Sequence, residues 1–179
     1  DVGAFFDQDG VVDDATFKQP DASPDPKVQH LVRVEGADVD VTDSEFDVVD
    51  SYGRQIIHIG YRNGATGDIA GNTLTGRKRA GILLDGSGTS GTVKRNDLTG
   101  VGETTSGWAE NGIQVSRGAT GTVNNNEVAD HWWNNNDFVS SGIILFGADQ
   151  VTVQRNTLAG NDIPLTLFGD ENNAVSNTV

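Results

Sequence analysis

The sequence predicts an all-β chain that folds as a right-handed parallel β-helix, a solenoid of about five to six coils with an internal asparagine ladder. Short Ile/Val/Leu triplets alternate with polar residues, as half-buried strands do, and 23 glycines with many Asn and Asp separate them. One asparagine recurs at positions 72, 96, 126, 156 and 177, hence at intervals of 21 to 30 residues. No 3.6-residue apolar stripe persists, so helices are not expected.

Three segments align directly with one another, residues 81–98, 112–128 and 142–158. Each contains three short strands with alternating apolar residues, joined by Gly/Asn/Asp turns. One such coil cannot bury its own apolar face, but coils stacked about 4.8 Å apart bury a continuous one. Less regular copies of the repeat occupy residues 32–46, 57–74 and 165–179.

The recurrent asparagine precedes the third strand of each coil. Asparagine tolerates the left-handed backbone that such a turn needs, and its amide can hydrogen-bond the same amide one rung away. Asparagine is also simply a common turn residue. Five occurrences at one position of the repeat favour the ladder.

The repeat divides the chain into two parts. Residues 1–27 are expected to form an N-terminal capping or irregular segment, and residues 28–179 the parallel β-helix. Val179 closes a third strand with no polar cover, and an uncovered strand edge invites pairing. We therefore expect either self-association through the open C-terminal coil or a chain that is a fragment of a longer protein.

The charge balance restricts the partners. A formal net charge of −14 repels nucleic acid phosphates and anionic membranes, so a nucleic acid partner is not expected. No apolar run approaches the roughly 18 residues that span a bilayer, so membrane insertion is not expected either. Excess Asp with few Lys is typical of proteins kept soluble at high salt, which suggests a halophilic source; a set of calcium sites is the competing interpretation.

The repeat, with its Asn turn before the third strand, resembles the parallel β-helix of the pectate-lyase-like superfamily over about residues 28–179. Polysaccharide lyases, glycoside hydrolases, uronate epimerases, phage tailspikes and non-enzymatic surface proteins share that architecture, so the resemblance implies a fold more than an activity. It also implies a substrate groove along the first strand of each coil, flanked by the loops that follow the third strand.

Loops on that side are long and aromatic. All three tryptophans fall in two neighbouring loops, and exposed indoles are surfaces against which sugar rings stack. The alternative is that the indoles fold inward and cap the coils. The candidate substrate-binding residues in these loops are Trp108, Glu110, His131, Trp132, Trp133 and Asp137.

Arg77, Lys78 and Arg79 form a basic run in a strongly acidic chain. Such a run can hold a carboxylate or a sulfate, or it can be a solvated turn. Together with the neighbouring tryptophans and with Arg33 it favours an anionic polysaccharide as the ligand.

Counting alternate residues along the first strands predicts two outward rows, with polar residues on early rungs and apolar residues on later ones. In this register Glu35 and Asp85 lie two rungs apart, about 10 Å, near the upper end of the roughly 6.5–9.5 Å that separates the carboxyls of inverting glycosidases. His58 is expected on the rung between them. The predicted rows are Arg33, His58, Leu83, Gln114, Ile144 and Thr166, and Glu35, Gly60, Asp85, Ser116, Phe146 and Phe168.

A lyase would instead need a base beside the uronate carboxyl, and cations to take up the developing negative charge. Arg33, Arg54, His58 and the basic run at 77–79 are the residues that could supply these parts. The catalytic candidates are therefore Glu35, Arg54, His58 and Asp85, although a lone histidine on a strand is more often a surface residue. Neither the hydrolase nor the lyase signatures of the superfamily are present.

No metal ligand can be named, since the acidic clusters spell neither an EF-hand nor an RTX loop. No cofactor is certain, and Ca²⁺ is the one candidate. The sequence thus indicates an extracellular or cell-surface carbohydrate-binding β-helix that acts on an anionic polysaccharide if it is a lyase or a hydrolase. The alternative is a non-catalytic surface, adhesion or filament-forming module.

Overall fold

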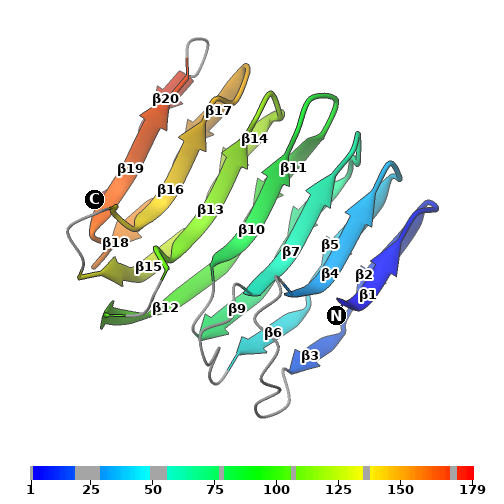
Figure 1. The fold of residues 1–179 in the computed structure, drawn as a ribbon, viewed down its shortest axis with the longest axis horizontal. Coiled ribbons are helices and arrows are strands. Elements are labelled where there is room, and N and C mark those ends of the chain that lie inside the picture. The colour runs from blue at the N-terminus through cyan, green and yellow to red at the C-terminus, as the bar shows by residue number, and fades with distance from the viewer. Residues whose placement is uncertain are drawn as a thin grey trace.

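The computed structural model describes residues 2–18, 29–48, 56–76, 79–105, 108–134, 138–169 and 173–179. The chain is a right-handed parallel β-solenoid, and three parallel sheets run along its axis. Figure 1 shows the coils stacked from the N-terminal rung (blue) to the C-terminal rung (red). The predicted fold class is confirmed.

Each of the first six coils contributes one strand to each sheet, and the last coil contributes strands to sheets A and B. Sheet A contains β1 (Val2–Phe6), β4 (Gln29–Glu35), β7 (Ile56–Arg62), β10 (Ala80–Asp85), β13 (Asn111–Ser116), β16 (Ser141–Phe146) and β19 (Ile163–Phe168). Sheet B contains β2 (Gly10–Asp13), β5 (Val39–Thr42), β8 (Asp68–Ala70), β11 (Ser90–Lys94), β14 (Thr120–Asn124), β17 (Val151–Gln154) and β20 (Asn173–Val175). Sheet C contains β3 (Thr16–Lys18), β6 (Glu45–Val48), β9 (Thr73–Gly76), β12 (Asp97–Thr104), β15 (Glu127–Trp133) and β18 (Thr157–Ala159).

The N-terminal segment differs from the prediction. Residues 1–27 were expected to be a cap or irregular, yet residues 2–18 form β1, β2 and β3, which pair in parallel with β4, β5 and β6. This segment is a full coil because Phe6, Val12 and Phe17 pack against the same core as the later coils. Among the described residues, sheets A and B therefore have seven strands each, six of them within residues 28–179.

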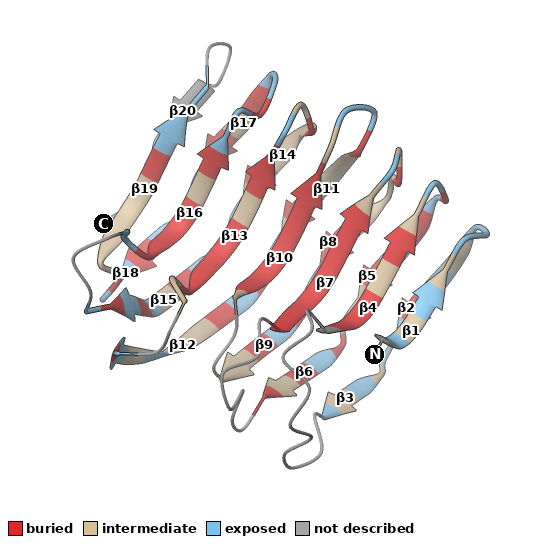
Figure 2. Ribbon diagram, in the orientation of Figure 1, coloured by how far each residue is buried: buried red, intermediate tan, exposed pale blue. Residues whose placement is uncertain are grey.

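The core is a set of aliphatic columns inside the solenoid. Val32, Ile59, Ile82, Ile113, Ile143 and Leu165 follow one another from β4 to β19 in direct register. The first five are fully buried, and Leu165 on the last rung is partly buried. Figure 2 shows the consequence as buried strands in the middle of the stack and exposed residues at the turns and on the end strands. Repetition makes up for the thinness of each coil, since each rung covers the next.

The asparagine ladder is present inside the turn between sheets B and C. The Oδ1 of Asn126 accepts hydrogen bonds from the backbone N–H and the Nδ2 of Asn96, both at 3.0 Å. The Nδ2 of Asn126 donates to Oδ1 of Asn156 at 2.9 Å and to the carbonyl of Val93 at 3.0 Å. Every polar atom of this buried amide is thus satisfied. At the N-terminal end Ser44 takes the asparagine's place, and its N–H donates to Oδ1 of Asn72 at 3.0 Å.

The reason given for the ladder residue was wrong in one respect. The left-handed backbone belongs to the residue before each ladder position, as in Asp43 (φ 45°), Arg95 (φ 54°) and Arg155 (φ 52°), and the ladder asparagines have negative φ. Asparagine is therefore selected for its amide rather than for its tolerance of positive φ. None of the described residues forms a helix, and so no helix among them is long and apolar enough to cross a membrane.

Candidate functional site

A groove of about 990 Å³ lies over the outward face of sheet A from β7 to β19. We call it the sheet A groove. Its walls come from residues just before the strands of this sheet and from the end of β15. Its lining includes Arg79, Trp108, Trp133, Phe138 and Val139 from the walls, and Arg62, Leu83, Asp85, Gln114, Ser116, Ile144, Phe146 and Phe168 from the sheet.

The floor of the groove changes character along the solenoid axis. The outward residues in one register row are Arg62, Asp85, Ser116, Phe146 and Phe168, from β7 to β19. The parallel row contributes Leu83, Gln114 and Ile144. The groove is therefore polar over β7 to β13 and apolar over β16 and β19, as the sequence predicted for early and late rungs.

His58 does not face this groove, and the predicted register of β7 was wrong by two residues. His58 is fully buried and its ring lies over Phe46 of the core, with 6.2 Å between centroids. It occupies the place that Gly81 and Gly112 take in later coils; a Cβ on Gly112 would meet Val128 Cγ1 at 2.4 Å. Strict alternation breaks here, because the residue before the first core residue of the strand also points inward.

The corrected register places Arg62 between Glu35 and Asp85. Glu35 is paired with Arg33, whose Nε donates to its Oε1 at 2.8 Å, and the Arg33 guanidinium lies 5.9 Å from the centroid of the Phe5 ring. Neither Arg33 nor Glu35 lines the sheet A groove. The structure thus does not bring Glu35, His58 and Asp85 together on one surface.

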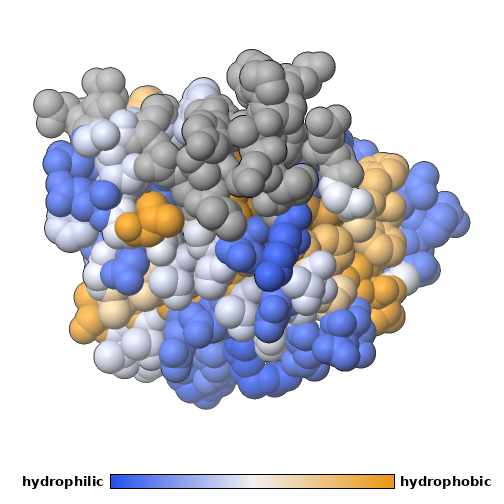
Figure 3. Space-filling view, turned by 90° about the horizontal axis from the view of Figure 1, so that it is seen from below, coloured by the Kyte–Doolittle hydropathy of each residue, from blue (hydrophilic) through white to orange (hydrophobic). Residues whose placement is uncertain are grey.

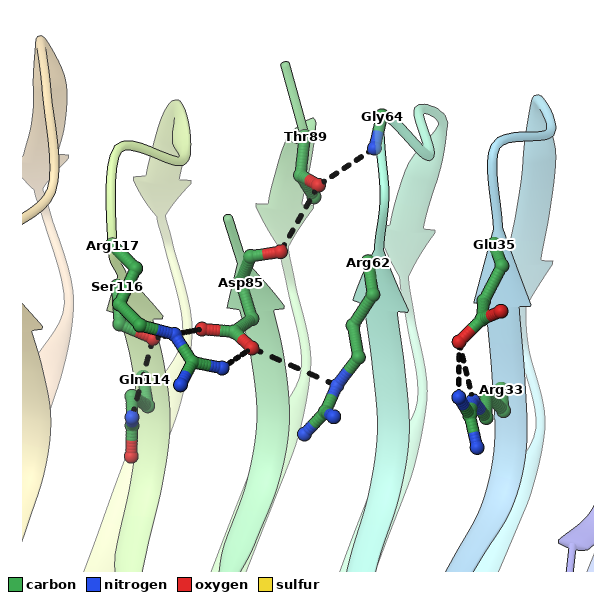
Figure 4. A network of polar contacts seen from close by, with 9 residues as sticks. All are labelled: Arg33, Glu35, Arg62, Gly64, Asp85, Thr89, Gln114, Ser116 and Arg117. Carbon is green, nitrogen blue, oxygen red and sulfur yellow. Dashed lines mark hydrogen bonds and ion pairs between the residues drawn. The ribbon is translucent and has the colours of Figure 1, made fainter. Parts of the chain in front are cut away.

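Asp85 is the centre of a charged network in the groove (Figure 4). Its Oδ1 accepts hydrogen bonds from Nε of Arg117 at 2.7 Å and from Oγ of Ser116 at 2.9 Å. A second N–H of Arg117 reaches Oδ2, and Nε of Arg62 lies 3.7 Å from Oδ2. Burial by itself raises the pKa of Asp85, but the hydrogen bonds from Arg117 and Ser116 and the charges of both arginines outweigh it, so the pKa lies below its usual value. A carboxylate held ionised in this way is a poor general acid.

Among the charged residues that line the groove, Arg117 and Arg62 were not predicted from the sequence. Arg117 has φ 54°, at the turn position where other coils have Gly36, Gly86 and Gly147. The repeat alignment could have shown this exception, and a non-glycine residue held in that conformation at a site is a reason to ask what its side chain does. Arg62 was hidden by the register error.

The guanidinium of Arg62 has an ion pair with Asp85 but no hydrogen bond to a described residue. Burial lowers its pKa, and Asp85 raises it in part. Its Nε is buried without a hydrogen bond, and no described residue accepts a hydrogen bond from its other nitrogens. In Figure 4 the dashed line from Arg62 starts at Nε, and none reaches its two terminal nitrogens. These donors line the groove and are available to an anion.

Two of the three tryptophans line the groove, and the third does not. Trp133 is 5% exposed and stacks on Phe138, with 6.3 Å between ring centroids and 16° between the planes. Trp108 lies on the same wall. Trp132, 41% exposed, falls on the opposite face of β15 because side chains alternate along a strand. The interpretation of all three as one binding platform is therefore corrected to two.

His131 and Glu110 were predicted to contact substrate, and the structure buries both. His131 is fully buried, and its Nδ1 and backbone N–H both lie 3.1 Å from Oδ1 of Asn161. Nδ2 of Asn161 donates to the carbonyl of Val128 at 2.8 Å, which repeats the ladder arrangement on a second turn. Glu110 is 1% exposed, and its backbone N–H donates to Oγ of Ser140 at 2.8 Å. Both residues belong to the wall's interior.

Arg79 alone represents the predicted basic run within the described residues. It lines the groove, its NH1 donates to the carbonyl of Ala109 at 3.3 Å, and burial lowers its pKa. The remaining candidate residues, Arg54, Arg77, Lys78 and Asp137, lie outside the described residues.

The aspartates of the acidic clusters accept hydrogen bonds from residues of the next coil. Asp13 accepts a hydrogen bond from Oγ1 of Thr42 at 2.6 Å, Asp38 from Oγ1 of Thr66 at 2.9 Å, and Asp40 from the backbone N–H of Asp68 at 2.8 Å. Across the described ranges, no three His, Cys, Asp or Glu side chains are grouped as metal ligands would be. A calcium site therefore stays a prediction without a located ligand set.

The comparisons with known proteins agree with the fold. The sequence model of the family described as "Right handed beta helix region" matches residues 32–179. No curated protein and no solved structure matches the chain. Because the family match covers more than half of the sequence and coincides with the stacked coils from β4 onward, the chain belongs to the right-handed β-helix family.

Proposed function

We propose that the chain binds an anionic polysaccharide in the sheet A groove, as a secreted or cell-surface carbohydrate-binding β-helix of the pectate-lyase-like type. One observation carries the proposal: an aromatic wall stands beside a floor that presents arginines. Trp108 and Phe138, the latter packed on the buried Trp133, offer the flat apolar faces on which sugar rings stack, and Gln114 offers an amide for sugar hydroxyls.

The charge inside the groove is opposite to the charge of the chain. Arg62, Arg79 and Arg117 line the groove, and Asp85 is the only carboxylate among the described residues that line it. A chain with a formal net charge of −14 attracts cations over most of its surface. An excess of guanidinium groups in this groove therefore distinguishes it from the rest of the surface as a site for an anion. Guanidinium binds carboxylate and sulfate through paired hydrogen bonds, which acidic sugars provide.

Binding is better supported than catalysis. A hydrolase of the inverting type needs a protonated carboxyl and a second carboxylate across the bond, but Asp85 is held ionised and Glu35 pairs with Arg33 outside the groove. A lyase that relies on arginines to take up negative charge would use the same groove. An increase in absorbance near 235 nm on incubation with alginate, pectate or a glycosaminoglycan would show such activity.

The test of binding is titration with an acidic oligosaccharide, such as an oligogalacturonate, followed by calorimetry. Trp108→Ala and Arg62→Gln are each expected to weaken binding about 5- to 30-fold, because a stacked ring or a charged hydrogen bond contributes roughly 1–2 kcal/mol. Trp132→Ala is the matched control, since it removes an exposed indole on the opposite face of β15. Equal affinities in all four proteins would refute the proposed site.

The competing proposal is a non-catalytic surface or filament module that associates through the last coil. Light scattering of the wild-type chain at low and high salt measures its mass and decides whether such association occurs. The acidic composition also supports a proposal of adaptation to high salt, because screening relieves self-repulsion. In that case the melting temperature rises markedly between 0.1 and 2 M NaCl.

A further inference from the structure

The sheet A groove has two chemically different halves, and together they define the ligand more narrowly. Resting on the proposed function, we propose that the acidic glycan bound here carries an apolar acyl group. The acidic sugar lies over β7 to β13, and the acyl group lies over β16 and β19.

The change from polar to apolar occurs between adjacent rungs. Arg62, Asp85 and Ser116 occupy three rungs of one outward row, and Phe146 and Phe168 occupy the next two. Five rungs contain four spacings of about 4.8 Å, so the row is roughly 19 Å long. One ligand that fills the groove therefore meets charged groups at one end and phenyl rings at the other.

The apolar half is unsuited to a bare sugar. Phe146 is 54% and Phe168 57% exposed, and their rings meet edge to face with 6.1 Å between centroids. Ile144 and Val139 complete this half, and none of these four side chains donates or accepts a hydrogen bond. A sugar placed here would lose hydration of its hydroxyls without replacement, at about 1–3 kcal/mol for each group. An acyl chain has no such groups to desolvate.

A second copy of the chain is a less suitable occupant. Two copies would bring together surfaces whose chains each have a formal net charge of −14, and this repulsion opposes association except at high salt. The guanidinium donors of Arg62 line the polar end of the same groove, where they can bind the carboxylate of an acylated acid whose acyl chain extends over the apolar half. Charge complementarity therefore favours the acylated glycan.

The experiment uses n-alkyl β-glucuronides, which carry a free carboxylate and an apolar chain of variable length. The dissociation constants of the methyl, butyl and octyl compounds are measured by calorimetry below their micellar concentrations. We expect the affinity to rise roughly three- to fourfold for each methylene that the groove buries. Phe168→Ser is expected to remove most of this gain, so that the octyl compound binds only slightly more tightly than the methyl compound. Phe5→Ser, a phenyl ring 52% exposed on β1 and outside the groove, is the control.

The outcomes separate the two proposals. If oligogalacturonate and methyl glucuronide bind but chain length has no effect, the acyl proposal is overturned and the proposed function stands. If none of the acidic sugars binds, the proposed function itself fails. Octyl glucoside, which lacks the carboxylate, should bind at least tenfold more weakly than octyl glucuronide, and equal binding contradicts the two-ended groove. Dimers in light scattering that Phe168→Ser dissociates would assign the apolar half to a second copy instead.

Discussion

Arg117, which follows β13, donates hydrogen bonds to both carboxylate oxygens of Asp85 at the end of the neighbouring strand β10. Arg117 does so from a left-handed backbone conformation. Two contributions to the stability of the fold oppose each other at Arg117. The positive φ costs about 1 kcal/mol in a residue with a Cβ, and hydrogen bonds to a charged group contribute roughly 1.5–3 kcal/mol. The balance favours the pair, although Arg117 itself is exposed enough for solvent to weaken it.

We predict that Arg117→Gly lowers the free energy of unfolding by about 1 kcal/mol. Glycine relieves the strain at this position, but Asp85 remains 5% exposed and keeps only Ser116 and the more distant Arg62 as partners. Urea denaturation measures the change. In the Asp85→Asn background the same substitution should have little effect or stabilise, and an undiminished loss there would contradict the role of the pair.

Arg95→Gly is predicted to have the opposite sign. Arg95 has the same φ of 54°, lies exposed before the ladder residue Asn96, and forms no side-chain hydrogen bond or ion pair with a described residue. Removing the Cβ relieves the strained conformation without breaking a contact, so stability should rise by up to about 1 kcal/mol. The comparison of Arg95→Gly with Arg117→Gly by the same denaturation measurement isolates what the ion pair contributes.

The ladder should be more sensitive in its middle than at its end. Asn126→Ala leaves the backbone N–H and one Nδ2 hydrogen of Asn96 without an acceptor in the interior, and it takes one donor each from Oδ1 of Asn156 and the carbonyl of Val93. We expect a loss of at least about 3 kcal/mol. Asn177→Ala takes the acceptor from two donors of Asn156 and a donor from the carbonyl of Val153, but Asn177 is only partly buried and water can replace it, so roughly 1 kcal/mol is expected. Thermal denaturation of both variants measures the difference, and equal losses would show that the amides act independently of their position.

His30 should make the fold sensitive to mild acid. It is 3% exposed, its ring nitrogens form no hydrogen bond, and burial together with the charges of Arg62 and Arg33 lowers its pKa to about 4, despite Glu35 nearby. Between about pH 6.5 and pH 4 the unfolded chain binds a proton that the folded chain does not, so stability falls as the pH falls, by up to about 3 kcal/mol. His30→Leu should flatten the dependence of unfolding free energy on pH in this window, and an unchanged slope would exclude His30 as its source.

Gly112 should tolerate no side chain. A Cβ there would lie 2.4 Å from Val128 Cγ1 and 2.5 Å from the carbonyl oxygen of Gly142, so Gly112→Ala must displace backbone. We expect a loss of about 1–3 kcal/mol, as is typical of overpacking. Gly86→Ala is a control of a different kind, because open space surrounds Gly86 and only its φ of 94° opposes the change. A smaller loss at Gly112 than at Gly86 would contradict the packing argument.

The sequence by itself determined the fold of this protein. A solenoid repeats one set of contacts, so the spacing of Asn72, Asn96 and Asn126 and the alternation of the aliphatic residues are enough to predict the coils and the ladder. The same repetition predicted that polar outward residues give way to Phe146 and Phe168 on the late rungs. Each of these features depends on local pattern and on stacking at a constant rise, both of which are visible in the chain.

Only the tertiary structure decided which side chains meet in the groove. The register of β7, which differs by two residues from the predicted one, brought Arg62 beside Asp85. A break in the strict alternation of the strand turned His58 into the core. The loops carry no repeat, so nothing in the sequence could show that Trp133 faces the groove and Trp132 does not, or that His131 is bound by Asn161 in the interior. The contact between Arg117 and Asp85 depends on a single turn conformation, and the packing of adjacent rungs supplies it.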